Sequence, residues 1–373
     1  MKVGIFDPYL DTLGGGERYM LTIASCLSEE HQVYLFWEDP AILNKSQDRF
    51  SLDLSKVEIF NNIFSPNYPF LKRLLETRKF DCIFFLSDGS IPFVLSKNLY
   101  VHFQFPVEWV NSSNTLTKLK LARTTRIICN SQFTKYYIDK KFGIKSVVIY
   151  PPSDIAIRKQ ESIISKGNII LTVGRFGKLA EGRSFKKQDI IIQTFKKMVD
   201  DGLSDWQLIV VISYKEKDRE EIYKLKDMVG KYPIQILENL SGNVLDTKYK
   251  SAKIYWHAVG FGEDLKKHPE LAEHFGMVTV EAMARGAVPV VFNAGGQKEI
   301  VEDNKNGFLW NTTGELIKKT NRLIHNHKLS KEMSREAIKR AKMFGGEERF
   351  CRELKAIISQ GDSFTKESPL QKG

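Results

Sequence analysis

Two glutamates spaced about two helical turns apart are the residues of this sequence best suited to bind a sugar. The segment 273–286 reads Glu-His-Phe-Gly-Met-Val-Thr-Val-Glu-Ala-Met-Ala-Arg-Gly, which places seven residues between Glu273 and Glu281. A helix that begins near Gly276 would carry Glu281 on its first turns and leave Glu273 just before its start. Carboxylates accept pairs of hydrogen bonds from vicinal sugar hydroxyls, and the N–H groups of a helix start attract phosphate. The plainer alternative is an exposed amphipathic helix with two solvated glutamates.

A glycine run near the start of the chain is a second candidate, in this case for anion binding. Gly14, Gly15 and Gly16 follow the first apolar run and precede a helical pattern. Glycines allow an anion to approach closely, and a helix N-terminus favours negative charge. The run lacks the Gly-Lys-Ser/Thr of a Walker loop and the spacing of a dinucleotide-binding fingerprint. A flexible turn without a ligand is the alternative.

Two sets of short apolar runs, each alternating with helical patterns, would position these residues. Continuous apolar strands that alternate with helices predict parallel sheets covered on both faces. The first set of predicted strands is 2–6, 32–37, 82–86, 99–103, 126–129 and 147–150. The second set is 168–173, 207–212, 234–237, 253–256 and 288–292. We therefore expect two doubly wound α/β domains with a cleft between them.

Breaks in these patterns set the expected domain boundaries. Pro151 and Pro152 cannot continue a helix or a central strand, so the first domain should end there. A polar stretch follows them, and the last residues of the chain are polar as well. The predicted division is 1–152 for an N-terminal Rossmann-like domain, 153–167 for a linker, 168–345 for a C-terminal Rossmann-like domain, 346–360 for a helix that packs back on the first domain, and 361–373 for a disordered tail.

The composition is that of an ordinary globular protein with an excess of positive charge. The 373 residues are 42% hydrophobic and 27% charged, which excludes a disordered, collagen-like or coiled-coil chain. The net charge of +11 favours an anionic partner such as nucleic acid, a phosphorylated ligand or an anionic membrane surface. Cys26, Cys82, Cys129 and Cys351 have no metal-binding spacing, so we expect four reduced thiols among core residues.

Several motifs in a fixed order resemble one enzyme family. Glu-His-Phe-Gly at 273–276 is followed by Ala-Met-Ala-Arg-Gly at 282–286, Pro-Val-Val at 289–291, Gly-Gly-Gln-Lys-Glu-Ile-Val at 295–301 and Asn-Gly-Phe-Leu at 306–309. With Gly-Gly-Gly-Glu-Arg at 14–18, they resemble the retaining nucleotide-sugar glycosyltransferases of family four. Within that family they are similar to the mannosyltransferases that extend dolichol-diphosphate oligosaccharides and to related bacterial polysaccharide enzymes. The resemblance covers most of the chain and implies the GT-B fold, in which two Rossmann-like domains face an interdomain cleft.

The resemblance implies a role for each residue of the Glu-His-Phe-Gly region. Glu273 would contact hydroxyls of the transferred sugar, and Glu281 would hold the nucleotide ribose. The backbone N–H groups near Phe275, Gly276 and Met277 would face the sugar and the diphosphate.

Cations and the glycine run complete the donor site that the resemblance implies. Arg175, after the predicted strand 168–173, and Lys187, before a helical pattern, would bind the diphosphate, whose departure needs cationic stabilisation. Gly15 and Gly16 would close on the phosphates from the other domain. The stretch 176–186 is long, and three further cations there compete with Lys187: Lys178, Arg183 and Lys186.

One histidine completes the expected catalytic set of Glu273, His102, Arg175 and Lys187. His102 ends the predicted strand 99–103, where the family carries a histidine near the sugar, although a buried histidine without a catalytic role is the alternative. The histidines form no metal-binding pattern, so we expect no metal and no other cofactor. The loop 263–270 departs from the family pattern and suits a lid or an acceptor contact.

The basic residues do not point to nucleic acid. They are spread along the chain, and no zinc, RNP or helix-turn-helix signature occurs. Two segments, 70–75 and 116–126, combine leucines with lysines and arginines and could lie on anionic lipid, unless they are ordinary solvated helices. Because no apolar run is long enough to span a bilayer, we expect a cytoplasmic protein, peripheral at the inner face of the membrane.

The expected activity is transfer of a hexose, with retention, from a nucleotide-diphosphate sugar to a hydroxyl of a lipid-linked glycan or polysaccharide acceptor. Mannose from GDP-mannose is the first assignment, and a UDP-sugar donor on the same fold is the alternative. A non-catalytic GT-B subunit is a further alternative, against which the joint presence of Glu273, Glu281 and Arg175 counts. A phosphorylase would need a cofactor or phosphate site that the sequence does not reveal.

Overall fold

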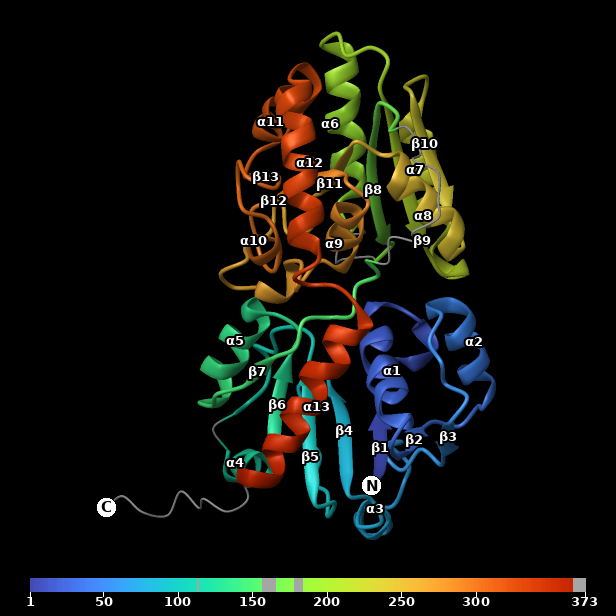
Figure 1. The fold of residues 1–373 in the computed structure, drawn as a ribbon, viewed down its shortest axis with the longest axis vertical. Helices are drawn as coiled ribbons and strands as arrows, with labels where there is room; N and C mark the ends of the chain where they lie inside the picture. Colours follow the sequence, from blue (N-terminus) through green and yellow to red (C-terminus); the bar gives the residue numbers. More distant parts are fainter. Residues whose placement is uncertain (113, 156–165, 178–183, 365–373) are drawn as a thin grey trace, which may run out of the picture. The chain divides into compact units, whose positions relative to one another are not determined.

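The chain divides into two units, each of which is built around one parallel sheet (Figure 1). The computed structural model describes residues 1–112, 114–155, 166–177 and 184–364. The N-terminal unit comprises Met1–Pro152 together with Glu347–Gly373, and the C-terminal unit comprises Ser153–Gly346. Most of the predicted linker 153–167, the competing cations Lys178 and Arg183, and the end of the predicted tail lie outside the described residues.

The sheet of the N-terminal unit has seven described strands, all paired in parallel, in the order β3-β2-β1-β4-β5-β6-β7. This is the strand order of a Rossmann-like doubly wound fold with one added strand. The strands are β1 (Lys2–Phe6), β2 (Gln32–Phe36), β3 (Val57–Phe60), β4 (Cys82–Ser87), β5 (Asn98–Phe103), β6 (Arg126–Cys129) and β7 (Val147–Val148).

The sheet of the C-terminal unit has six described strands, also parallel, in the order β10-β9-β8-β11-β12-β13. Its order repeats the Rossmann pattern, so the expectation of two doubly wound α/β units is confirmed. The strands are β8 (Ile169–Arg175), β9 (Gln207–Ser213), β10 (Ile234–Glu238), β11 (Ile254–His257), β12 (Val288–Phe292) and β13 (Phe308–Trp310).

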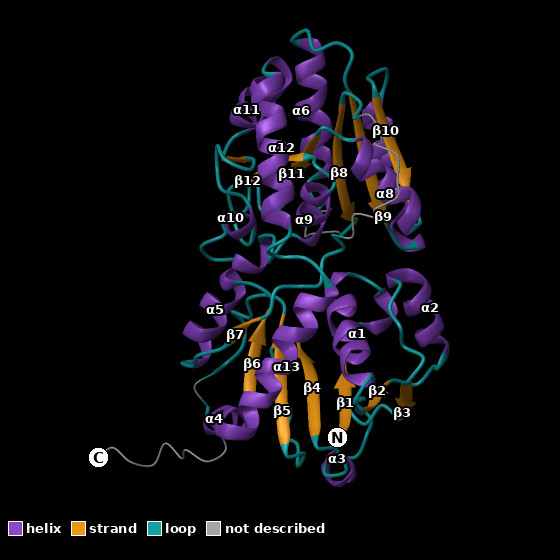
Figure 2. Cartoon of the chain, viewed as in Figure 1, coloured by secondary structure: helices purple, strands orange, loops and turns teal. Residues whose placement is uncertain are grey.

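Helices cover both faces of each sheet (Figure 2), because strands buried on both sides need an apolar layer above and below. In the N-terminal unit they are α1 (Gly15–Ser28), α2 (Ala41–Phe50), α3 (Phe70–Thr77), α4 (Thr115–Ala122), α5 (Gln132–Phe142) and α13 (Glu347–Phe364). In the C-terminal unit they are α6 (Gln188–Asp200), α7 (Arg219–Val229), α8 (Gly242–Ser251), α9 (Met277–Ala284), α10 (Gln297–Ile300), α11 (Thr313–His325) and α12 (His327–Ala341). Among the described residues, no helix is both long and apolar enough to cross a membrane.

The last helix, α13, belongs to the core of the N-terminal unit. Phe350 and Leu354 are fully buried in the cluster that holds α1 and one face of the first sheet, and the Phe350 ring meets Tyr19 edge-on at 4.8 Å. Arg349 also donates hydrogen bonds to the carbonyl oxygens of Tyr150 (2.7 Å) and Pro151 (3.2 Å). The helix continues to Phe364, so the prediction of disorder from residue 361 is wrong for four residues, because no proline interrupts the helix before Pro369.

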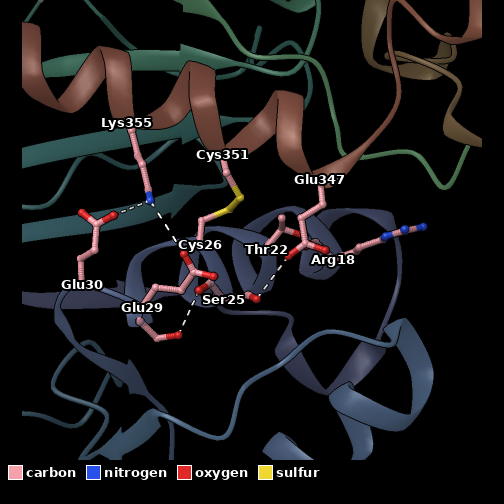
Figure 3. Close-up of a disulfide and its surroundings, with 10 residues drawn as sticks. Arg18, Thr22, Ser25, Cys26, Glu29, Glu30, Glu347, Cys351 and Lys355 are labelled. Carbon is pink, nitrogen blue, oxygen red and sulfur yellow. Dashed lines mark hydrogen bonds and ion pairs between the residues drawn. A yellow bond between two sulfur atoms is a disulfide. The ribbon is translucent and has the colours of Figure 1, made fainter. Parts of the chain in front are cut away.

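A disulfide joins α1 to α13 and corrects the expectation of four reduced cysteines (Figure 3). Cys26 and Cys351 are 325 residues apart in sequence, yet their Cα atoms lie 5.5 Å apart because α13 packs beside α1. The expectation holds for Cys82 and Cys129, which are buried and are not joined in a disulfide. The sulfur atoms and the Glu347 carboxylate would suit a metal ion only as free thiolates, and the disulfide consumes both thiols.

Polar contacts accompany the disulfide along the same helix pair. The Lys355 ammonium of α13 lies 2.8 Å from a carboxylate oxygen of Glu30 and 3.9 Å from one of Glu29, at the end of α1. The Ser25 hydroxyl donates to Glu347 at 3.3 Å. Lys355, Glu29 and Glu30 are exposed or half-exposed, so their ion pairs contribute little beside the covalent link and the buried rings.

Candidate functional site

Candidate residues of the C-terminal unit gather at the carboxyl edge of its sheet. Arg175 ends β8, His257 ends β11, and the segment that carries Glu273 follows β11. The strands β8, β11 and β12 are neighbours in the sheet, so the loops that follow them meet at one edge. In doubly wound folds, ligands bind outside the carboxyl ends of the strands at such a place.

Glu273 is held by two other side chains. Its Oε2 accepts hydrogen bonds from the Lys186 ammonium at 2.7 Å and from Nε2 of His257 at 2.8 Å. Burial acts to raise the pKa of Glu273, but the Lys186 charge and the His257 ring outweigh it and hold that pKa below its usual value. Among the described residues, Oε1 of Glu273 has no hydrogen-bond partner. One carboxylate oxygen is therefore fixed, and the other is left for a hydroxyl donor.

The protonation of His257 follows from the same contact. Burial lowers the pKa of His257, against the opposing effect of Glu273, so the ring is neutral near pH 7. A carboxylate only accepts hydrogen bonds, so Nε2 must carry the proton. Nδ1 is then a bare acceptor, and it is buried with no hydrogen-bond partner in the described part of the chain. His257 therefore fixes Glu273 as a neutral donor.

Two glycines fix the backbone of Glu273. The Gly296 N–H donates to the Glu273 carbonyl at 2.7 Å. A Cβ at Gly295 would lie 2.1 Å from the same carbonyl oxygen, and Gly295 has a φ of +59°, so a side chain there is excluded twice. The loop after β12 can therefore pack directly against the backbone at Glu273.

The helix predicted to begin near Gly276 is α9, whose first residue is Met277 and whose N-cap is Gly276, with a φ of 112°. Phe275 and Gly276 are buried, and Met277 is half-buried. Glu281 is half-buried on this helix and lies 3.2 Å from the hydroxyl of Tyr249. Glu273 and Glu281 make different hydrogen bonds, and both charges act on the buried Tyr255, whose pKa is raised mainly by burial.

Lys186 and Lys187, which compete for one role in the sequence, bind different carboxylates. Lys187 is the N-cap of α6 with a φ of +55°, and its ammonium pairs with Glu263, with both side chains less than one-tenth exposed. Lys186 instead binds Glu273, and its aliphatic stem crosses Gly174, where a Cβ would lie only 3.1 Å away. Arg175 is exposed at the end of β8. The diphosphate role predicted for Arg175 and Lys187 stays a prediction.

Three contacts of this site were not expected from the sequence. Lys186 is one of the cations that compete with Lys187 in the sequence, His257 is given no role by the motifs, and Glu263 lies in the loop 263–270, which departs from the family pattern. The signal for His257 was its place at the end of a predicted strand, but nothing in the sequence pairs it with a glutamate sixteen residues later. His274 turns away from this group, since its Nε2 lies 2.9 Å from the carbonyl oxygen of Glu270.

The glycine run of the N-terminal unit lies among carboxyl groups. Gly15 and Gly16 are the first two residues of α1. The backbone N–H of Gly14, the N-cap, donates a hydrogen bond to the carboxylate of Glu17 in the first turn. Asp7 lies just after β1, and burial, followed by the Glu17 charge, raises its pKa to about 8. Binding of a phosphate at Gly15 and Gly16 stays a prediction. The carboxyl groups of Asp7 and Glu17 beside the glycine run count against it.

His102 is in the interior of the N-terminal unit. It is 1% exposed, its ring stacks on Tyr19 with the centroids 3.9 Å apart, and its Nδ1 lies 3.1 Å from the Ile128 carbonyl oxygen. Burial lowers the pKa of His102 to about 3, so the ring is neutral and Nδ1 carries the proton toward the carbonyl. Nε2 is buried, and no described residue forms a hydrogen bond with it. A catalytic role for His102 stays a prediction.

The two basic segments form α3 and α4, at the opposite edge of the first sheet. α3 leads into β4 and α4 leads into β6, so both lie near the amino ends of the strands (Figure 1). Large apolar side chains of both helices are exposed, and α4 buries none of its residues. The exposed apolar residues are Phe70 (51%), Leu71 (74%), Leu75 (63%), Leu116 (59%) and Leu119 (53%).

Two Rossmann-like units, with a buried carboxylate and cations at the carboxyl edge of one of them, are the architecture expected of a GT-B glycosyltransferase. The family model "Glycosyl transferases group 1" matches residues 153–340, and the model "Glycosyltransferase Family 4" matches residues 13–156. The chain belongs to the glycosyl transferases of group 1.

Individual relatives are distant. The chain is 24% identical over 240 residues to a GDP-Man:Man(3)GlcNAc(2)-PP-Dol alpha-1,2-mannosyltransferase of Dictyostelium discoideum, covering 59% of this chain and 44% of the relative. It is 28% identical over 220 residues to trehalose synthase of Thermococcus litoralis, covering 55% of this chain and 51% of the relative. The matched region thus spans about half the length of these relatives.

Solved structures confirm the fold. Anabaena HepE, crystallised with UDP and glucose, matches with a TM-score of 0.70 at 19% identity, covering 96% of this chain and all of that one. The fold is therefore GT-B, as the motifs predicted.

Proposed function

We propose that the protein is a retaining hexosyltransferase that moves mannose from GDP-mannose to a hydroxyl of a lipid-linked glycan or a polysaccharide. The observation that carries the proposal is the group formed by Glu273, Lys186 and His257 at the carboxyl edge of the second sheet. It presents one ionised carboxylate oxygen, held in place through the other oxygen, to a ligand that donates hydrogen bonds. Sugar hydroxyls are such donors.

The chemistry asked of these residues is orientation of the sugar and stabilisation of the leaving diphosphate. Oε1 of Glu273 accepts from hydroxyls of the transferred sugar, and Lys186 keeps Glu273 ionised. The backbone N–H groups of Phe275, Gly276 and Met277, at the N-terminal end of α9, face the diphosphate, because a helix start favours negative charge. Arg175 and Lys187 supply positive charge as the bond to the leaving group lengthens. Glu281, beside Tyr249, holds the ribose.

The site so described needs no divalent cation, because lysine, arginine and helix-start N–H groups meet the charge of the diphosphate. Retention of the anomeric configuration is part of the proposal through the family likeness. A second donor, a UDP-sugar, is supported by the UDP and glucose bound in HepE. Trehalose synthase among the relatives supports testing glucose as well as mannose.

The test is a panel of nucleotide sugars with mannose-terminated and glucose-terminated oligosaccharide acceptors. We expect release of GDP from GDP-mannose, an α-linked product by NMR, and activity that persists in EDTA. Release of UDP from a UDP-hexose instead would assign the second donor. No release from any donor, under conditions where the folded protein binds GDP or UDP, would contradict the proposal of a transferase.

A lipid-linked acceptor adds a peripheral membrane contact to the proposal. α3 and α4 expose leucines beside Lys72, Lys118, Lys120 and Arg123, a composition that suits an anionic lipid surface. These helices lie at the amino edge of the first sheet, and strands of five or six residues separate that edge from the loops at the other by about 20 Å. An acceptor anchored below α3 and α4 therefore needs a glycan long enough to reach the carboxyl edge.

A further inference from the structure

Two large aromatic side chains are exposed on loops at the carboxyl edge of the first sheet. Tyr9 follows β1 and is 42% exposed, and Trp109 follows β5 and is 60% exposed. The strands β1, β4 and β5 are neighbours, so the loops that follow them lie side by side. The carboxyl edge is where doubly wound folds bind ligands, so these two exposed rings offer their apolar faces at a place suited to a ligand.

The structure holds Trp109 in a fixed place. A Cβ at Gly89, after β4, would lie 3.3 Å from the indole Nε1, and Gly89 has a φ of +119°, so the glycine allows the two loops to touch. The Trp109 ring lies over Phe105 with the centroids 5.9 Å apart and the planes tilted by 30°. Contacts with Phe105 and with the loop at Gly89 therefore hold the exposed Trp109 ring in one orientation.

Carboxyl groups surround the two rings. Oδ1 of Asp88 accepts from the Ser90 N–H at 3.3 Å and the Ser90 hydroxyl at 3.0 Å, and within the described residues its Oδ2 has no hydrogen bond. Asp7 is 3% exposed; its Oδ1 accepts from the Tyr9 N–H at 2.8 Å, and its Oδ2 is buried and has no hydrogen-bond partner among the described residues. The pKa of Tyr9 is raised by burial and then by the charges of Asp88, Asp7 and Glu17, which places these groups close together.

We propose that Tyr9, Asp88 and Trp109, with the unpartnered oxygen of Asp7, form a binding subsite for a neutral pyranose ring. The negative face of an aromatic ring attracts the polarised C–H groups on the apolar face of a sugar. Carboxyl oxygens accept from its hydroxyls. The Asp88 charge opposes phosphate and anionic lipid, so a neutral glycan is the ligand that this subsite favours.

The assignment of this sugar to the acceptor rests on the proposed function; the subsite itself does not. The carboxyl edge of the first sheet carries the acids Asp7 and Asp88 near Tyr9 and Trp109. The carboxyl edge of the second sheet carries the cations Arg175, Lys186 and Lys187. A charged donor and a neutral glycan are therefore served by different units. The part of the acceptor bound here is a sugar rather than a phosphate or a lipid chain.

The test measures binding of neutral oligosaccharides to the full chain by calorimetry, without any donor. The probes are mannose-terminated and glucose-terminated oligosaccharides, with inorganic phosphate and anionic phospholipid vesicles as separate arms. The variants are Trp109→Ala and Asp88→Asn, and the control is Tyr223→Ala, which removes a ring that is 50% exposed on α7 of the other unit. Unchanged melting temperatures establish that each variant is folded.

We expect wild-type protein to bind at least one neutral oligosaccharide. Trp109→Ala should weaken that binding about tenfold, the size of a good ring contact, Asp88→Asn should weaken it severalfold, and the control should leave it unchanged. Equal binding by wild type and Trp109→Ala, no binding by wild type, or a loss confined to phosphate or vesicles would each overturn the proposal. Because no donor is present, failure of nucleotide-sugar turnover with intact glycan binding removes the transferase proposal alone.

Discussion

Removing the link between Cys26 and Cys351 should destabilise the N-terminal unit by a measurable amount. The disulfide joins residues 325 positions apart, and the loop-closure entropy for a loop of that length gives an upper value of about 6 kcal/mol. Measured disulfides typically contribute about 3 kcal/mol. For units of this size, 3 kcal/mol corresponds to a fall of about 6–12 °C in the melting temperature. The buried rings of α13 remain in the variant, so α13 should stay docked at room temperature.

The assay compares thermal unfolding of wild type and Cys351→Ser, each with and without a thiol reductant. Wild type should melt lower when reduced, and Cys351→Ser should melt at that lower temperature in both conditions. Thiol titration of the denatured, unreduced wild type should find only Cys82 and Cys129. Four reactive thiols in a sample never exposed to reductant, or equal melting of reduced and oxidised wild type, would refute the reasoning.

Three further perturbations test separate parts of the molecule. Lys187→Ala should lower the rate of transfer by about 10²–10³ while nucleoside binding persists; near-native steady-state kinetics of Lys187→Ala would contradict a diphosphate contact at Lys187. Native Asp7 keeps its proton up to about pH 8, whereas the unfolded chain releases it near pH 3.8. The contribution of this proton to the free energy of unfolding is therefore fully present below pH 3.8 and is lost as the pH rises through 8. Urea unfolding from pH 4 to 9 should therefore show wild type falling relative to Asp7→Asn; parallel curves would contradict the raised pKa. Replacing Lys118, Lys120 and Arg123 by Glu should reduce salt-sensitive sedimentation with anionic liposomes, and salt-insensitive binding to neutral vesicles, or none to either, would remove the membrane contact.

Most of the fold could be predicted because its strands are continuous apolar runs. All eleven predicted strands are present, since strands buried on both faces leave a dense apolar signal. The two missed strands lie at sheet edges. β3 has the half-exposed sequence Val-Glu-Ile-Phe, and β13 has only three residues, so neither shows a run long enough to read. An edge strand needs less apolar surface because only one neighbour covers it.

The site was predictable to the level of motifs but not of contacts. The start of α9 followed from Gly276, whereas adjacent lysines cannot be separated by spacing. Lys187, whose backbone has a positive φ, pairs with Glu263, whereas its neighbour Lys186 pairs with Glu273. The disulfide could not be predicted, for a related reason. Cys26 and Cys351 come together only when α13 packs beside α1 in the folded chain, and no local spacing in the sequence identifies them as a pair. Long-range pairing of side chains is a property of packing that local patterns do not encode.

The most direct measurement of the central claim is transfer by Glu273→Gln, with Glu281→Ala as its counterpart. Gln keeps the size of Glu273 but removes the negative charge that Lys186 and His257 hold in place. We expect sugar transfer to fall by at least about 100-fold while GDP or UDP still binds, and Glu281→Ala to weaken nucleotide binding itself. Near-native turnover by a folded Glu273→Gln, with the donor that wild type uses, would contradict the placement of the transferred sugar at Glu273.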